Sequence, residues 1–272
     1  MFKDVIIGQY VEGNSFIHRL DSKIKIILTM LFMVLLFVVD SVPAYLCITL
    51  YVATIVIMCD VPFKLIIKGL KPMLFILAFT AVMNLFMTSG EALVSVNVFS
   101  LFTISVSKQG VINAVFMVIR LLYLLISTSV LTLTTTPLML TDGIERLLRP
   151  LKVIKVPSHE IAMMMTIALR FIPTLADETD KIMKAQAARG ADFESGSLIR
   201  RAKAMIPILV PLFVSAFRRA DELATAMESR CYTGGEGRTK MNESHVTSLD
   251  YLATGIFVMV ALLALSFEYI IF

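Results

Sequence analysis

Two arginines with closely similar neighbours are the residues of this chain best suited to hold a partner protein. Arg189 and Arg230 each end a helical sequence pattern, and both segments fit A-x-x-[AS]-R-[GC], with the arginines 41 positions apart. A cation at a helix C-terminus is stabilised by the helix dipole by about 0.3–1 kcal/mol, and a guanidinium can bind a carboxylate through two hydrogen bonds. The candidate partner-binding residues are Ala188, Arg189, Gly190, Ser229, Arg230 and Cys231.

This repeated pattern admits two interpretations. Arginine is common in the last turn of a helix, so the two segments could be ordinary helix ends without a binding role. Small residues beside each arginine instead favour close approach of another surface, and repetition of one end on two neighbouring helices favours two equivalent docking points for two similar partners. Spacing alone leaves both interpretations open.

No other motif in the sequence indicates catalysis, a cofactor or a metal. The phosphate-binding pattern G-x-x-x-x-G-K-[ST] does not occur, and the glycine-rich segment 234–237 lacks the strand and helix of a nucleotide site. The histidines and cysteines are scattered, without metal-ligand or C-x-x-C spacing. His159 beside Glu160 could form an acid–base pair, but a helix start explains both residues more simply. We expect no catalytic residue, metal or cofactor in this chain, and the net charge of +4 without a basic stripe predicts no nucleic-acid partner.

The composition indicates an integral membrane protein. Of 272 residues, 57% are hydrophobic and 17% are charged, whereas soluble domains carry about 25% charged residues. A helix needs about 20 apolar residues to cross a bilayer. The sequence therefore predicts an all-α membrane protein with about five transmembrane helices. The predicted spans are Ile24–Val39, Ala44–Met58, Met73–Met87, Val111–Leu133 and Leu249–Ile271.

The distribution of lysine and arginine predicts the orientation of the chain. Positive residues precede the first span, recur between the second and third, and number sixteen in the range 137–248, whereas the other loops carry almost none. By the positive-inside rule the N-terminus is cytoplasmic and the C-terminus lies outside. We expect a membrane region at 1–135 with four spans, cytoplasmic coupling helices at 136–248, and the last span at 249–272.

Two features of the apolar segments stay open at this point. The run Ile206–Phe217 has only twelve residues and contains two prolines, which favours a buried or interfacial helix over a span. Arg120 lies well inside the fourth predicted span, where a charge is costly. Its side chain could extend to the membrane surface, pair with Asp40 or Glu91, or face another helix.

Several stretches resemble the transmembrane T component, EcfT, of energy-coupling factor transporters, which are ATP-driven micronutrient importers. The resemblance covers nearly the whole chain, and its most specific feature is a pair of Ala-Arg-Gly-like triplets, here 188–190 and 229–231. The second triplet departs from Ala-Arg-Gly at both flanks but keeps the arginine. The other matching stretches are 8–10, 18–23, 136–151, Pro157, Glu160 and 168–173.

The resemblance implies a non-enzymatic coupling subunit in a prokaryotic cell membrane. In this family two ABC-type ATPase subunits bind ATP and magnesium, and the T component's coupling helices sit in grooves on them. A separate membrane protein, the S component, captures the vitamin or metal ion. By this analogy Arg189 and Arg230 would each bind acidic residues of one ATPase groove. The alternatives are a T component dedicated to one cobalt, nickel or biotin system, or a self-contained secondary transporter.

Overall fold

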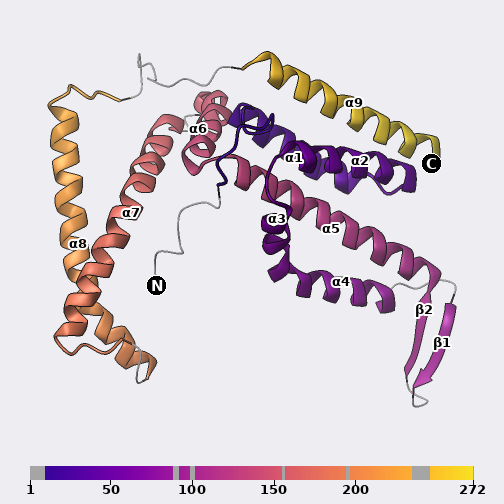
Figure 1. Ribbon diagram of the computed structural model, residues 1–272, viewed down its shortest axis with the longest axis horizontal. Coiled ribbons are helices and arrows are strands. Elements are labelled where there is room, and N and C mark those ends of the chain that lie inside the picture. Colours follow the sequence, from indigo (N-terminus) through magenta and orange to yellow (C-terminus); the bar gives the residue numbers. More distant parts are fainter. Residues whose placement is uncertain are drawn as a thin grey trace. The chain divides into compact units, whose positions relative to one another are not determined.

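The computed structural model describes residues 10–87, 92–98, 102–154, 157–193, 197–234 and 246–271, which are mostly helical (Figure 1). The chain divides into two compact units. We call the first, Gly8–Gly143 with Ser244–Phe272, the membrane unit, and the second, which contains Ile144–Glu243, the arm unit. Some features discussed above lie outside the described residues: 8–9, Glu91, 235–237 and His245.

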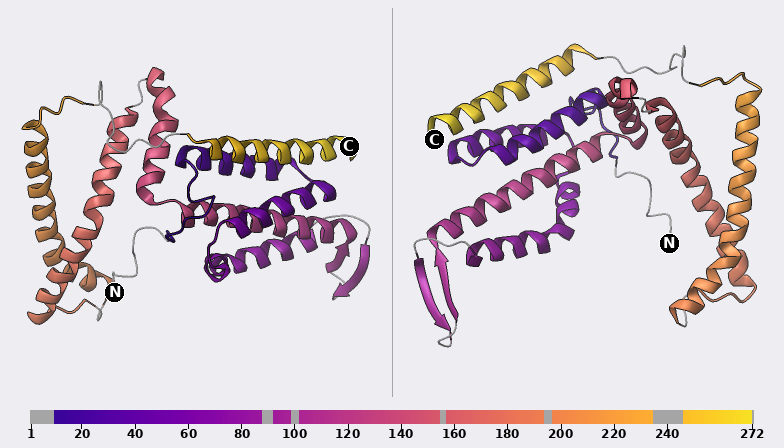
Figure 2. Two further views of the ribbon diagram at one scale, coloured as in Figure 1. Left: turned by 45° about the horizontal axis from the view of Figure 1, so that its top comes forward. Right: turned by 180° about the vertical axis from the view of Figure 1, so that it is seen from behind.

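The membrane unit is a bundle of helices that are apolar around most of their circumference. Within it α4 packs on α5, α2 packs on α9, and α1 packs on α5 (Figure 2). Its elements are α1 (Ser22–Val38), α2 (Val42–Met58), α3 (Phe63–Leu70), the 3-10 turn η1 (Lys71–Met73), α4 (Leu74–Met87), α5 (Lys108–Thr134), the first residues of α6 (Pro137–Leu148), and α9 (Ser248–Ile271).

Side-chain caps begin two of these helices. The first N–H groups of a helix have no partner within the helix, so a side-chain oxygen just before it satisfies them. Asp21 Oδ1 accepts from Lys23 N at 2.8 Å at the start of α1. Ser107 Oγ accepts from Gly110 N at 2.9 Å at the start of α5. These caps fix where the two helices enter the bundle.

Each predicted span falls on a helix of the membrane unit, but not all five meet a length and hydropathy criterion for crossing a bilayer. Three segments of the described residues do so: Phe63–Leu85, Lys108–Thr134 and Ser248–Ile270. The first begins ten residues before the predicted Met73, because η1 accommodates Pro72 and joins α3 to α4 without a break. The helices α1 and α2 are apolar but shorter, at 17 residues each.

Burial in the membrane unit follows the pattern of a protein surrounded by lipid. Leu36, Ile48 and Ala264 are fully buried between the helices. Large apolar side chains such as Leu50 and Phe75 are mostly exposed on the outer surface. Such extensive apolar exposure would be unfavourable in water, and it agrees with the membrane protein that the composition predicts.

A β-hairpin is an exception to the predicted all-helical fold. Strand β1 (Ala92–Val98) pairs antiparallel with β2 (Phe102–Ser107), with Val94 opposite Val106 and Val98 opposite Phe102. The range 88–110 was predicted to be a loop between two spans. Valine alternates with polar residues in 94–98, the period-two pattern of a strand, so the signal was present in the sequence.

The arm unit consists mainly of two helices, α7 (Ser158–Ala188) and α8 (Leu198–Glu228), each 31 residues long. They follow the end of α6 and the 3-10 segment η2 (Arg149–Ile154), and they pack against each other where they cross (Figure 1). Pro173 lies inside α7, and Pro207 and Pro211 lie inside α8. The ambiguous run Ile206–Phe217 is therefore an internal part of α8 rather than a separate helix.

Candidate functional site

The end of α7 has the hydrogen bonds of a Schellman motif. In this motif the N–H of the second residue past the helix cap donates to the carbonyl five positions earlier, and the residue before it adopts a left-handed conformation. Ala191 N donates to Gln186 O at 3.0 Å, and Gly190 N donates to Ala187 O at 2.9 Å. Gly190 has φ +86°, a conformation that glycine adopts without a Cβ penalty. Arg189 thus occupies the cap position.

The end of α8 repeats this geometry bond for bond. Tyr232 N donates to Met227 O at 3.0 Å, and Cys231 N donates to Glu228 O at 2.9 Å. Cys231 has φ +55°, so it takes the left-handed place of Gly190 although it carries a side chain. Arg230 is therefore the cap residue of a second Schellman motif. Departure from Ala-Arg-Gly in the second triplet has not altered the backbone of this end.

Both arginines are available to a partner. Their own N–H groups make equivalent bonds, from Arg189 N to Gln186 O at 3.0 Å and from Arg230 N to Met227 O at 3.1 Å. All six candidate residues of the two triplets are exposed. Within the described parts of the chain neither guanidinium has an ion-pair partner. Among the described residues the structure thus presents two matched, unpaired cations on two helices of equal length.

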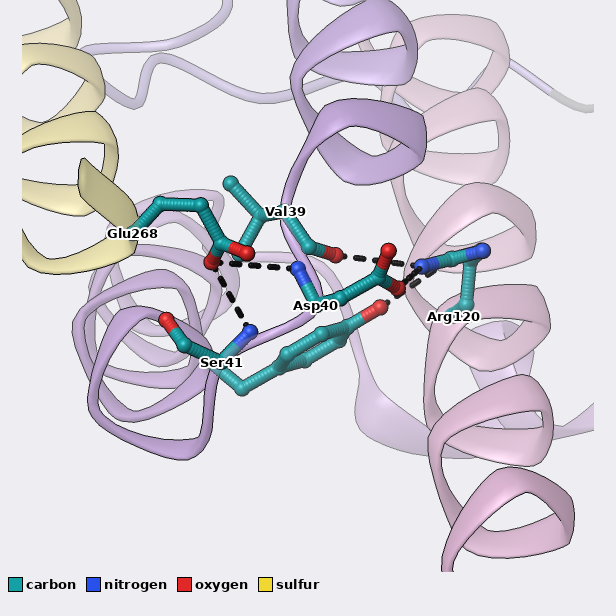
Figure 3. Close-up of polar contacts among 6 residues, drawn as sticks. Val39, Asp40, Ser41, Arg120 and Glu268 are labelled. Atoms are coloured by element: carbon teal, nitrogen blue, oxygen red, sulfur yellow. Dashed lines mark hydrogen bonds and ion pairs between the residues drawn. The ribbon is translucent and has the colours of Figure 1, made fainter. Parts of the chain in front are cut away.

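Arg120, in contrast, makes three hydrogen bonds inside the membrane unit (Figure 3). Its Nε donates to Tyr45 Oη at 3.0 Å, and its Nη2 donates to Val39 O at 3.1 Å and to Asp40 Oδ1 at 2.6 Å. Of the partners considered from the sequence, Asp40 is the one that the structure identifies. The arginine on α5 therefore holds the turn between α1 and α2.

Glu268 on α9 also binds the turn between α1 and α2, through its carboxylate (Figure 3). Glu268 Oε2 accepts from Ser41 N at 2.8 Å and from Asp40 N at 3.2 Å, next to the start of α2. A carboxylate at a helix N-terminus is favoured by the free N–H groups and by the helix dipole. We call the six residues that meet here the Arg120 cluster: Val39, Asp40, Ser41, Tyr45, Arg120 and Glu268.

A second buried polar group lies at the other end of α1 and α9. Asp250 is 0% exposed; its Oδ1 accepts from Asp21 N at 2.7 Å, and its Oδ2 accepts from the N–H and hydroxyl of Thr247 at 2.7 and 2.8 Å. Lys25 Nζ donates to Thr134 O at 3.0 Å, the last carbonyl of α5, where a cation is favoured. We call Asp21, Lys25, Thr134, Thr247 and Asp250 the Asp250 cluster.

Sequence reasoning missed the Asp250 cluster, although one local signal pointed to it. Thr247 and Asp250 have the spacing of a capping box, in which a carboxylate three residues into a helix returns to the first N–H. Contact between Asp250 and Asp21 joins residues 229 positions apart, and no local pattern predicts such a contact.

The two histidines that the structure describes, His159 and His18, contact groups other than Glu160. Within the arm unit, His159 Nδ1 lies 3.1 Å from Glu145 Oε1. His18 contacts Ser15 Oγ at 2.6 Å and Val11 O at 3.0 Å in the membrane unit. Among the described residues no three His, Cys, Asp or Glu side chains are grouped as a metal site would need.

Comparison with known proteins identifies the family to which this chain belongs. The family described as CbiQ, cobalt transport protein, matches residues 13–241. The energy-coupling factor transporter transmembrane protein EcfT of Ruminiclostridium cellulolyticum is 54% identical over 272 residues, 100% of both chains. The chain belongs to the EcfT family. EcfT of Clostridium kluyveri is 56% identical over 93% of each chain, and EcfT of Bacillus subtilis is 48% identical over 92% of this chain and 93% of the relative. This EcfT-family chain is thus a transporter membrane component, and the apolar helices of its membrane unit fit that assignment.

Proposed function

We propose that this chain is the non-catalytic coupling subunit of an energy-coupling factor importer for vitamins or other micronutrients. The single observation that carries the proposal is the pair of matching Schellman ends on α7 and α8, each presenting an arginine that has no ion-pair partner among the described residues. Two ABC-type ATPase subunits, which hold ATP and magnesium, would each receive one end. Because a pair of ATPases offers two similar grooves, two matched helix ends are the arrangement that such a pair can bind.

Docking of a helix end in a groove would use the arginine as its polar anchor. A guanidinium binds a carboxylate bidentately, and the exposed small residues beside Arg189 and Arg230 leave room for an acidic groove wall. The motion of the ATPases then reaches the arm unit only if the contacts differ between nucleotide states. We therefore expect acidic side chains of each ATPase to face one arginine.

The membrane unit would cross the lipid bilayer of a prokaryotic cell five times, with the N-terminus in the cytoplasm and the C-terminus outside. The three long apolar helices support three of these crossings. The predicted spans on α1 and α2 are the remaining two; their 17-residue length is at the lower limit for crossing a bilayer.

The S component would meet apolar side chains of the arm unit. Met164 and Met165 on α7 and Phe213 and Phe217 on α8 are largely exposed. Methionine is flexible and fits partners of different shape, which suits a subunit that serves several S components.

Replacing both arginines tests the proposal. In the variant with Arg189→Ala and Arg230→Ala, we expect ATP-driven uptake to be lost and ATPase subunits no longer to co-purify, while the chain remains in the membrane at normal amounts. The matched control carries Lys184→Ala and Lys203→Ala, which remove two exposed cations from the same helices. Unchanged uptake in the arginine variant, with ATPases still bound, would refute the proposed docking.

A dedicated cobalt, nickel or biotin system is the second candidate, because the matching family is described as a cobalt transport protein. Purification of the tagged chain from native membranes in mild detergent separates the two. Two ATPases with several small membrane proteins would support a shared module, and one recurrent small partner would support a dedicated system. Recovery of the chain alone, still transporting a solute in liposomes, would support a secondary transporter instead.

A further inference from the structure

An ion pair joins α7 to α8 at the same distance from both arginine ends. Arg219 Nη2 donates to Glu178 Oε2 at 2.6 Å, and the two side chains are 28% and 25% exposed. Glu178 lies eleven residues before Arg189, and Arg219 lies eleven residues before Arg230. The residues of the pair are 41 positions apart, the same separation as the two arginines.

The eleven-residue spacing fixes how far each residue of the ion pair lies from its arginine and on which face of the helix. At a rise of 1.5 Å per residue, eleven residues place each arginine about 16 Å along its helix from the ion pair. Eleven residues also complete about three helical turns, so a residue of the pair and its arginine lie near the same face of the helix. The helices α7 and α8 cross with their C-terminal ends pointing apart (Figure 1). Each arginine lies on the C-terminal side of its own residue of the ion pair.

The neighbouring positions show that the contact is selective. Asp177 and Arg218 are also equivalent and also of opposite charge, one residue before Glu178 and Arg219. Both are exposed, and neither has an ion-pair partner among the described residues. The crossing of the two helices thus brings one of two adjacent charge pairs into contact and leaves the other in solvent.

We propose that Glu178 and Arg219 are positioning residues that set the separation and relative orientation of the two arginine ends, so that both ends fit their partner subunits at once. This inference rests on the proposed function. Docking two ends on two linked subunits requires both ends to be correctly spaced, because a second site contributes only if geometry allows simultaneous binding. An ion pair at equal distance from the two ends constrains both helices with one contact.

Charge reversal tests this role. Glu178→Arg places two arginines against each other, and Arg219→Glu places two carboxylates against each other, whereas the double variant restores a pair in reverse. We expect each single variant to lower ATP-driven uptake roughly fivefold or more, the scale of a coupling between sites, and the double variant to recover most of it. Asp177→Arg is the matched control, since it makes the same charge change one residue away on the exposed side.

A distance measurement separates positioning from a general effect on folding. Spin labels at positions 184 and 225, which are equivalent and exposed, report the separation of the two helix ends. We expect a narrow distance distribution in the parent complex and in the double variant, and a broad or shifted one in each single variant. ATP hydrolysed per substrate transported should rise in the single variants.

Two results would overturn the inference: single reversals with unchanged uptake and distances, or a double variant that recovers neither. The arginine variant described above keeps this distinct from the proposed function. If removing both arginines abolishes uptake but reversing Glu178 does not, the docking stands and the positioning role fails. If removing both arginines has no effect, the docking itself fails.

Discussion

Two sets of charged residues, one in the membrane unit and one at the helix ends of the arm unit, differ in whether they have partners within the chain. In the membrane unit Arg120, Glu268 and Asp250 each make at least two hydrogen bonds to other parts of the unit. In the arm unit Arg189 and Arg230 are exposed and have no ion-pair partner among the described residues. One set of charges holds helices together within the chain, and the other is left free for another protein.

This difference follows from what surrounds each unit. A charge inside a bilayer is costly unless it is paired, so ionisable groups in the spans are expected to be satisfied within the protein. An exposed arginine in water costs little and can stay unpaired until a partner supplies a carboxylate. The clusters at the two ends of α1 therefore indicate a fixed bundle, whereas the helix ends of α7 and α8 form a surface that is accessible to a partner protein.

The largest expected effect on stability comes from removing the Asp250 carboxylate. Asp250→Ala leaves three donors without an acceptor, and because bonds to charged groups contribute about 1.5–3 kcal/mol each, we expect a loss of about 3–5 kcal/mol. The measurement is thermal unfolding of the purified complex in detergent. Glu222→Ala, which removes an exposed carboxylate from α8, should change stability by less than about 0.5 kcal/mol. Equal effects of the two substitutions would contradict the comparison of the units.

A smaller effect is expected at the Arg120 cluster. Arg120→Ala removes bonds to Tyr45, Val39 and Asp40, but the Asp40 side chain is 72% exposed and can be rehydrated. We expect a loss of about 2 kcal/mol, with Arg120→Lys intermediate because an ammonium cannot reproduce the planar fork. The same unfolding assay measures it, with Arg200→Ala on the exposed surface of α8 as control. A variant as stable as its parent would show that this end of the bundle does not depend on the arginine.

The smallest effect distinguishes the two otherwise matched helix ends. Cys231→Gly should stabilise the end of α8 by about 1 kcal/mol, because a side chain is disfavoured in the left-handed conformation. Gly190→Ala should destabilise the end of α7 by a similar amount; a Cβ there would meet no atom within 4 Å, so the penalty arises from the backbone alone. Hydrogen exchange of the amides at 190–191 and 231–232 reports each end separately. Opposite shifts are expected, and shifts of the same sign would mean that the two ends differ in structure.

Local features of the fold were predictable from the sequence. Apolar length located a helix at every predicted span, and the residue types around Gly190 predicted where α7 ends. Cys231 shows the limit of that reasoning, because glycine rather than cysteine is the residue expected in a left-handed position at a helix end. The hairpin was not predicted, although valine alternates with polar residues at 94–98.

Contacts between distant residues were not predictable. Glu268 reaches Ser41 across 227 positions, and Asp250 reaches Asp21 across 229. These pairings depend on how α9 packs against α1 and α2, which no pattern in a single sequence specifies. Arg120 could be recognised as costly, but choosing among its partners required the turn between α1 and α2 to be placed in space.

Pro207 and Pro211 give α8 a stiffness that changes along its length. Proline has no N–H, so the carbonyls of Lys203 and Pro207 receive no hydrogen bond from the residue four positions later. Two successive turns near the start of α8 therefore resist bending less than the seventeen residues from 212 to 228, which contain no proline. A force applied at Arg230 is therefore transmitted through a stiff part of α8 as far as Arg219. Bending of α8 is expected only N-terminal to Arg219, in the turns that contain Pro207 and Pro211.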